Sequence, residues 1–226
     1  MKLKSEHYKQ YEIYIILSFS IFSVVFWNSS IIYPIKFFVV LLHEISHSIM
    51  TIITGGSVQE IFISFNLGGS TLTIGGNRLL IASAGYLGSV IFGTVLFFAG
   101  YNKKQTVLIC TVVSLIIFLH TIGYIQGGIQ IVLGLAFSLF LFFMPRYFNS
   151  IIFTYILKFI GLTSSLYVVS DIIEDLITTS LRETDAQAIE FITGIPSIVI
   201  GLVWLFISIL TIYFLIRYSY KKGLKN

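Results

Sequence analysis

The amino-acid sequence predicts an all-α polytopic membrane protein: a bundle of about six to seven transmembrane helices with one short β-hairpin. Of the 226 residues, 56% are hydrophobic and 11% are charged, and the mean hydropathy is +0.94, whereas soluble domains carry about 25% charged residues. Long apolar runs recur along the chain, and one glycine-rich segment interrupts them. This length suits a single domain over residues 1–226 rather than several domains.

Seven apolar segments approach the roughly 20 residues that a helix needs to cross a hydrocarbon core of about 30 Å. The sixth is expected to continue as a helix into the polar stretch that follows it. The candidate spans are 11–27, 33–53, 79–100, 106–121, 125–144, 150–170 and 193–217. The glycines near residues 123–128 also allow a different division of 106–144.

Basic residues near both chain ends bear on the topology. The positive-inside rule places both ends in the cytoplasm, yet seven full spans cannot satisfy that arrangement. We therefore expect a half-span, a merger of two segments, or one terminus that departs from the rule. The net charge of +4 comes from scattered or terminal Lys and Arg residues. This pattern indicates contact with the lipid bilayer rather than with nucleic acid.

Residues 54–78 differ from the rest of the chain. Glycine pairs at 55–56, 68–69 and 75–76 bracket two runs, 58–65 and 70–74, which alternate and favour β-branched residues. This pattern predicts a hairpin with its turn at 66–69, and the alternative is a plain loop. Open strand edges cannot face lipid, so the hairpin must lie at the surface or against the helices. There it could hold an extended peptide by edge pairing.

His43, Glu44 and His47 form an HExxH motif inside the second candidate span. On a helix this spacing puts two imidazoles one turn apart, where both can bind one Zn²⁺. The Glu lies beside them and can take a proton from the attacking water. Ionisable groups within a membrane segment indicate a functional site. The plainer alternative is a pair of structural histidines that are hydrogen-bonded to their neighbours.

Small residues recur at 84/88 and 85/89 in the next span. This small-xxx-small spacing lets two membrane helices approach closely. It is a packing signal, and it could seat this helix against the one that carries HExxH.

A catalytic zinc generally has three protein ligands and an open position, so a third ligand must come from elsewhere. His7 lies in the polar N-terminal tail and is a poor candidate. His120 lies near a span end and remains an alternative. The three Asp residues of the chain are Asp171, Asp175 and Asp185, and all fall within fifteen residues.

Asp171 is the preferred third ligand because it directly follows an apolar run that could carry it to membrane depth. Asp171, Glu174 and Asp175 also share one helical face by their i, i+3, i+4 spacing. Asp175 ranks second. Asp185 ranks third, because it is expected to cap the helix that follows it.

Four stretches resemble the site-2 protease class of intramembrane zinc metalloproteases, in its compact M50B-like branch. They are His43–His47, residues 54–61, residues 81–89 and residues 165–175. The resemblance implies that His43 and His47 are zinc ligands, that Glu44 is the general base, and that an Asp on a later helix is the third ligand. Better-known members carry that Asp in a Leu-Asp-Gly motif, which this sequence lacks.

The expected function is that of an intramembrane zinc endopeptidase, a multi-pass protein that hydrolyses peptide bonds of transmembrane protein substrates. The missing Leu-Asp-Gly motif motivates an alternative, a non-proteolytic metal-binding partner or chaperone on the same scaffold. A small transporter is a third interpretation. It requires ionisable groups spread over several helices, and here they cluster on two.

Overall fold

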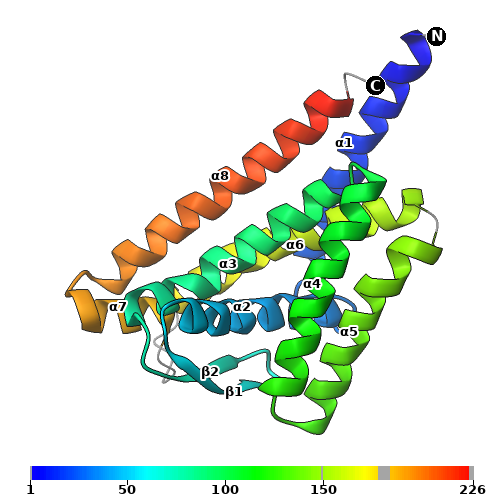
Figure 1. Ribbon diagram of the computed structural model, residues 1–226. Coiled ribbons are helices and arrows are strands. Elements are labelled where there is room, and N and C mark those ends of the chain that lie inside the picture. The colour runs from blue at the N-terminus through cyan, green and yellow to red at the C-terminus, as the bar shows by residue number, and fades with distance from the viewer. Residues whose placement is uncertain (1, 149, 178–183, 224–226) are drawn as a thin grey trace.

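The computed structural model describes residues 2–148, 150–177 and 184–223 (Figure 1). In these residues the chain forms eight helices and a two-stranded antiparallel sheet. The elements are α1 (Lys2–Val25), α2 (Tyr33–Ile53), β1 (Ser57–Ile63), β2 (Gly69–Ile74), α3 (Arg78–Ala99), α4 (Lys103–Gly123), α5 (Gly128–Tyr147), α6 (Ser150–Ile177), α7 (Asp185–Thr193) and α8 (Ser197–Gly223).

Six of the described helices, α2 to α6 and α8, are long and apolar enough to cross a membrane. In α1 the apolar part is shorter and covers Tyr14–Val25. The predicted fold class is therefore confirmed, and the protein is an integral multi-pass membrane protein. The expected continuation of the sixth span is also confirmed, because α6 extends to Ile177.

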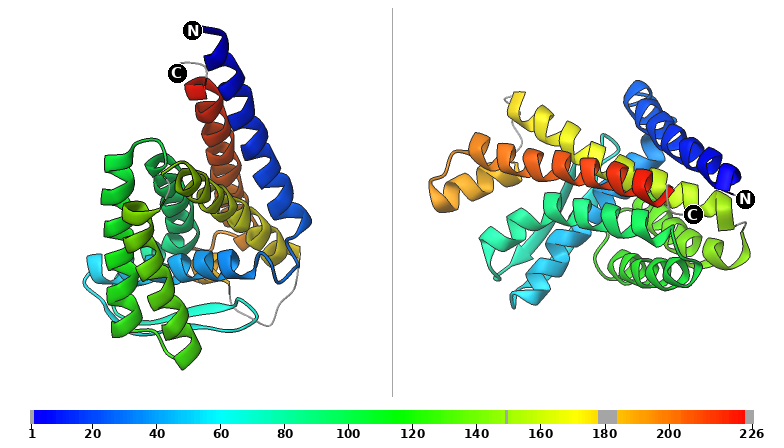
Figure 2. Two further views of the ribbon diagram at one scale, coloured as in Figure 1. Left: turned by 90° about the vertical axis from the view of Figure 1, so that its right-hand side faces the viewer. Right: turned by 90° about the horizontal axis from the view of Figure 1, so that it is seen from above.

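The start of α1 and the end of α8 lie side by side at one end of the bundle (Figures 1 and 2). Helix α2 follows α1 in the sequence and runs crosswise to both α1 and α8 (Figure 2). Helix α2 therefore does not return the chain to the end at which α1 begins. This crosswise path explains how both chain ends share one end of a bundle that contains seven apolar helices.

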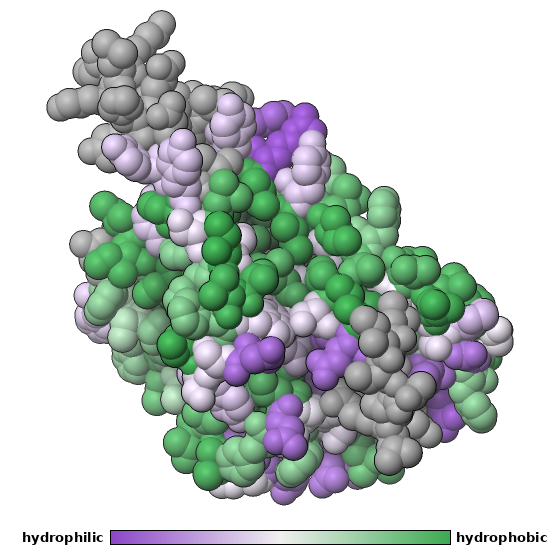
Figure 3. Space-filling view, turned by 180° about the vertical axis from the view of Figure 1, so that it is seen from behind, coloured by the Kyte–Doolittle hydropathy of each residue, from purple (hydrophilic) through white to green (hydrophobic). Residues whose placement is uncertain are grey.

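The most buried long helix is α2, because other elements cover it on most sides. Its side chains Phe38, Leu41 and Ile45 are at most 2% exposed, and they belong to the main core together with residues of α4, α5 and β1. Helix α8, in contrast, exposes apolar side chains such as Leu202 and Phe206. Figure 3 shows a broad hydrophobic zone across one face of the molecule, which is the surface that lipid would cover.

The predicted hairpin is confirmed, with strands Ser57–Ile63 and Gly69–Ile74 in antiparallel register. A register shift between Val58 and Glu60 marks a bulge. The turn contains Leu67 at a φ of 65°. Before the hairpin, Gly55 adopts a φ of 81°, a conformation that glycine reaches without steric cost, and this residue lets the chain leave α2 sharply.

One edge of the hairpin is already covered. The connection between α4 and α5 runs beside β1: Ile61 N donates to the Tyr124 carbonyl at 2.8 Å, and Gln126 N donates to the Ile61 carbonyl at 2.9 Å. In the described part of the chain the sheet has only two strands, so the outer edge of β2 has no strand beside it. From the same strand, the Thr71 side chain reaches Glu44 of the HExxH motif.

Candidate metal centre

His43 and His47 project from one face of α2 toward the first turn of α7. Asp185 Oδ2 lies 3.1 Å from His43 Nε2 and 3.2 Å from His47 Nε2. The three ligand atoms all lie within 4.8 Å of one another, and among the described residues this is the only group of three or more His, Cys, Asp or Glu that could hold a metal ion. Segments far apart in the sequence thus meet at one point.

Asp185 reaches the imidazoles because another residue caps α7. Thr184 is the N-cap: Gln187 N donates to its hydroxyl at 3.3 Å, and Thr184 N donates to the Gln187 side chain at 3.0 Å. This reciprocal pair is a capping box. The expectation that Asp185 caps the helix was wrong, and the capping box leaves its carboxylate free to face α2.

The other sequence candidates lie elsewhere. Asp171 is on α6, where it interacts electrostatically with Lys36 near the start of α2, and it is not in the metal-binding group. The side chains of Asp175 and His7 fall outside the described residues. His120 donates from Nδ1 to the Ile116 carbonyl of its own helix at 2.8 Å. In the described residues it is therefore Asp185, and not the preferred Asp171, that lies beside the two histidines and could complete a metal site.

Two observations fit a zinc ion at these three side chains: the distances between their ligand atoms, and a buried carboxylate oxygen without a hydrogen-bond partner. Asp185 Oδ2 is buried and has no hydrogen-bond partner. Ligand atoms about 2.0–2.1 Å from a tetrahedral zinc lie about 3.3 Å apart. The observed separations of 3.1 and 3.2 Å between imidazole nitrogen and carboxylate oxygen agree with that geometry.

Neighbouring groups fix the two imidazole rings. His47 Nδ1 lies 2.7 Å from the Ile81 carbonyl. Because a carbonyl only accepts, Nδ1 carries the proton and Nε2 presents its lone pair to the cluster. This second contact is common for metal-binding histidines. The Tyr86 ring packs edge-on against His43, at 5.0 Å between ring centroids and an interplanar angle of 88°.

Two glycines of α3 bring that helix against the HExxH face. A Cβ at Gly85 would overlap Nε2 of both imidazoles, and a Cβ at Gly88 would overlap the Ser46 side chain. The small residues of this span therefore seat α3 on α2, as their spacing predicted. Gly85 is also a site residue that sequence reasoning read only as packing.

Glu44 lies between the histidines and the hairpin, and it is 3% exposed. The Thr71 hydroxyl of β2 lies 2.7 Å from Glu44 Oε2 and 3.1 Å from the Glu44 carbonyl oxygen. Gly69, at the start of β2, has no Cβ that would overlap the Glu44 carboxylate. The hairpin thus holds Glu44 in place. No sequence pattern indicated Thr71, because this contact depends on how the hairpin folds back against α2.

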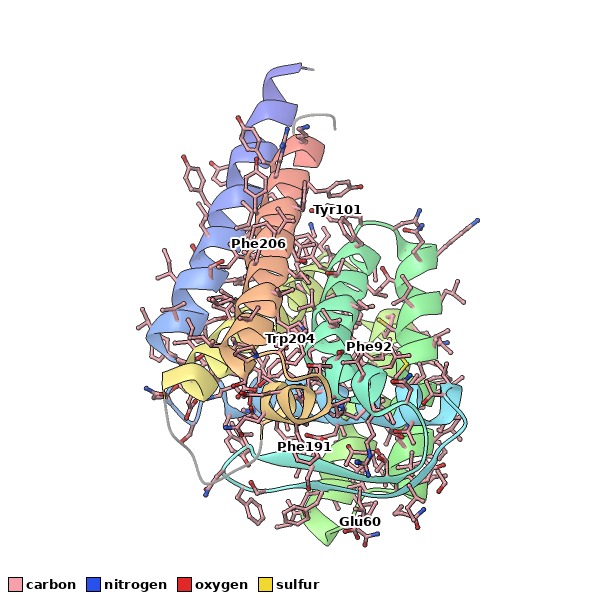
Figure 4. All side chains as sticks on the ribbon, turned by 90° about the vertical axis from the view of Figure 1, so that its left-hand side faces the viewer. Glu60, Phe92, Tyr101, Phe191, Trp204 and Phe206 are labelled. Atoms are coloured by element: carbon pink, nitrogen blue, oxygen red, sulfur yellow. The ribbon has the colours of Figure 1, made fainter. Side chains whose placement is uncertain are left out.

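An open cavity lies in front of these groups, between α2, β2, α3 and α7. His43, Glu44, His47 and Asp185 line its inner wall, and residues of β2 line one side. Phe191 and Ile192 of α7 line the other side, and Phe191 is 88% exposed. Figure 4 shows Phe191 on α7 above the hairpin. The cavity therefore offers polar groups at its base and an apolar rim.

Comparison with known proteins agrees with this arrangement. The family model described as "Peptidase M50B-like" matches residues 16–215, which include every element of the site. No curated protein and no solved structure gives a significant match. Because the family model covers most of the sequence, the chain belongs to the M50B-like peptidase family.

Proposed function

We propose that this protein is an intramembrane zinc endopeptidase that hydrolyses peptide bonds of membrane-embedded protein substrates. One observation carries the proposal: His43, His47 and Asp185 converge beside Glu44 at the base of an open cavity. The family supports a peptidase, and the donor set of two imidazoles and one carboxylate is a common one for catalytic zinc.

His43, His47 and Asp185 would hold the ion and leave a position open toward the cavity. When bound there, zinc supplies a Lewis acid that polarises the scissile carbonyl and lowers the pKa of water. The chain has no Leu-Asp-Gly motif, and Asp185 of α7 would supply the carboxylate ligand in its place.

Glu44 would act as the general base. Its carboxylate accepts the proton of the attacking water and later delivers it to the leaving amine. The Thr71 hydroxyl bond orients this carboxylate. Low exposure of Glu44 keeps bulk water from competing for the same oxygens.

The outer edge of β2 would bind the substrate. A substrate helix must unwind before hydrolysis, because its helical hydrogen bonds occupy the carbonyl groups. The unwound strand could then pair with β2 by strand addition. Because Gly69 and Thr71 line the cavity and contact or border Glu44, a strand paired there would pass in front of the proposed base.

The test is Glu44→Gln in the full-length protein, assayed by cleavage of a candidate membrane substrate and by zinc content. General acid–base catalysis typically contributes about 10²–10⁴-fold, so we expect a loss of that size with zinc retained. Glu60→Gln is the matched control, since Glu60 is exposed on β1. Equal cleavage by wild type and Glu44→Gln would refute the mechanism. Bound zinc without Glu44-dependent cleavage would favour the non-proteolytic metal-binding alternative.

A further inference from the structure

One positively charged side chain lines the cavity in front of the candidate metal centre. It belongs to Arg78, the first residue of α3 and the only Lys or Arg among the described residues that line this cavity. The carboxylates in the same lining are Glu44 and Asp185. Glu44 accepts a hydrogen bond from the Thr71 hydroxyl, and Asp185 faces the two imidazoles. Both carboxylates thus have partners of their own at the inner wall of the cavity.

Arg78 has an exposed side chain on a fixed backbone. It forms no ion pair with any residue that the structure describes. Asn77 holds the start of α3 beneath it, because its side chain accepts a hydrogen bond from Leu80 N at 3.1 Å and its own N donates to Thr54 Oγ1 at 3.0 Å. The guanidinium is therefore available to a partner from outside the described chain, at a defined place on the cavity wall.

The spacing along α3 sets how far Arg78 lies from the candidate metal ligands. Arg78, Ala82 and Gly85 follow one another at i, i+4 and i+7, so they share one face of the helix. Gly85 is where the two imidazoles approach α3, and Ala82 lines the cavity between them with a methyl group only. At a rise of about 1.5 Å per residue, Arg78 begins about 10 Å from the imidazoles along the helix axis. About three residues of an extended peptide span that distance.

The course of β2 leads to the same residue. Thr71 contacts Glu44, and Thr73 lines the cavity two positions further along the strand. The chain then turns and begins α3 at Arg78. A substrate strand paired with the outer edge of β2 would therefore extend from the proposed base toward Arg78. The rim of the other wall, on α7, carries the apolar Phe191, so charge recognition at this opening falls to the guanidinium.

We propose that Arg78 selects substrates that carry an Asp or Glu side chain about three residues from the scissile peptide bond. This inference rests on the proposed endopeptidase function. A guanidinium binds a carboxylate through paired N–H···O hydrogen bonds, a geometry that a neutral amide side chain cannot match. Arg78 is thus a specificity-determining residue, and it takes no part in metal binding or proton transfer.

The selection is tested with reporters that differ in one side chain. Each reporter carries the same transmembrane segment with a helix-breaking Asn-Pro pair, and Glu or Gln is placed at successive positions on either side of that pair. Mass spectrometry locates the bond that is cut. We expect the best Glu reporter to exceed its Gln counterpart in kcat/KM by about 5- to 10-fold, between the effect of an exposed ion pair and that of a hydrogen bond to a charged group.

Variants of Arg78 assign that preference to its side chain. Arg78→Gln should remove the preference, and Arg78→Glu should reverse it in favour of a Lys reporter. Lys103→Gln is the matched control and should keep the preference, because Lys103 is also an exposed cation directly after an Asn N-cap but lies outside the cavity lining. A preference that persists in Arg78→Gln overturns the proposal. An equal loss on the Glu and Gln reporters also overturns it, and assigns Arg78 to lipid headgroups or to the fold.

Binding separates this inference from the proposed proteolysis. The Glu44→Gln protein, with and without Arg78→Gln, is titrated in detergent micelles with fluorescent peptides that carry the Glu and Gln segments. Tighter binding of the Glu peptide should depend on Arg78. If it does and no reporter is cut, the proteolysis fails while the selection stands. If reporters are cut in a Glu44-dependent way without preference for Glu, the selection fails while the proteolysis stands. Equal binding of both peptides overturns the selection.

Discussion

Two buried polar clusters lie at opposite ends of this protein, and they differ in how their carboxylates are satisfied. In the cluster beside α1, Glu12 Oε1 accepts hydrogen bonds from Lys158 at 2.5 Å, Tyr101 at 2.9 Å and Ser219 at 2.7 Å. At the metal centre, Asp185 Oδ2 is buried without a hydrogen-bond partner. The first carboxylate has its cation within the chain, and the second faces two imidazole nitrogens.

The difference separates a structural cluster from a functional one. A buried ion pair whose members have their hydrogen bonds satisfied within the chain joins helices and requires no ligand. Here the pair connects α1, α6, α8 and the end of α3. A buried carboxylate without a donor is costly, and it persists where a ligand completes its bonding. In the described part of this chain, the candidate metal centre leaves a carboxylate oxygen without a partner beside two imidazole nitrogens.

The largest effect is expected for Asp185→Ala. Removing one of three ligands should abolish zinc binding in the purified protein, measured as zinc per chain by elemental analysis. Asp171→Ala is the matched control, because Asp171 is also a half-buried Asp but lies outside the metal-binding group, and it should retain zinc. If both variants retain zinc equally, the ligand set is wrong.

Lys158→Met breaks the other cluster. It removes the cation from Glu12, and breaking a buried pair in this way costs about 3–5 kcal/mol. Denaturant unfolding in detergent micelles should report that loss, while zinc content per folded chain stays unchanged. The double variant Glu12→Gln/Lys158→Met removes both charges and should recover part of the stability. Equal stability of the single and double variants would show that the pair is not buried as described.

Gly85→Ala tests how tightly α3 is fitted to the metal ligands. Because the added methyl would overlap both imidazoles, the rings must turn from their present positions. We expect zinc affinity to fall by about 10- to 100-fold, the size seen when groups that orient ligands are altered. Gly123→Ala is the control, since a Cβ there meets no atom within 4 Å. Unchanged affinity in Gly85→Ala would mean that α3 does not constrain the ligands.

The smallest effect is expected for Thr71→Val, which removes the hydroxyl that contacts Glu44. A hydrogen bond to a charged group contributes about 1.5–3 kcal/mol, so kcat should fall at least about 10-fold with little change in KM or zinc content. Thr71→Ser keeps the hydroxyl and should restore kcat. Thr73→Val is the control, because Thr73 lines the same cavity but makes no described bond to Glu44. A matching loss in both valine variants would assign the effect to the strand rather than to the bond.

Much of the fold was predictable because local patterns determine it. The alternation and glycine pairs of residues 54–78 do not depend on distant contacts, and the hairpin formed where expected. HExxH spacing alone brings His43 and His47 to one side of α2. The crosswise path of α2 was not predictable, since it arises from the packing of several helices around the most buried one.

The sequence preference for Asp171 over Asp185 does not match the placement of the two residues, for a physical reason. Asp171 follows an apolar run and shares a helical face with other carboxylates, yet α6 carries it toward Lys36 and away from His47. Asp185 looked like a helix cap, but the Thr184–Gln187 capping box satisfies the first turn of α7. The Thr-x-x-Gln pattern was visible in the sequence. Only the fold shows that the residue after the cap points at the histidines.

The capping box at the start of α7 also bears on how the protein is made. Asp185 lies late in a chain of 226 residues, long after His43 and His47. During synthesis, a chain that has not yet reached residue 185 lacks the proposed third ligand, even if its earlier helices have already folded. The enzyme would thus remain incomplete while its first helices insert into the membrane, and it would acquire its metal only when α7 folds back against α2.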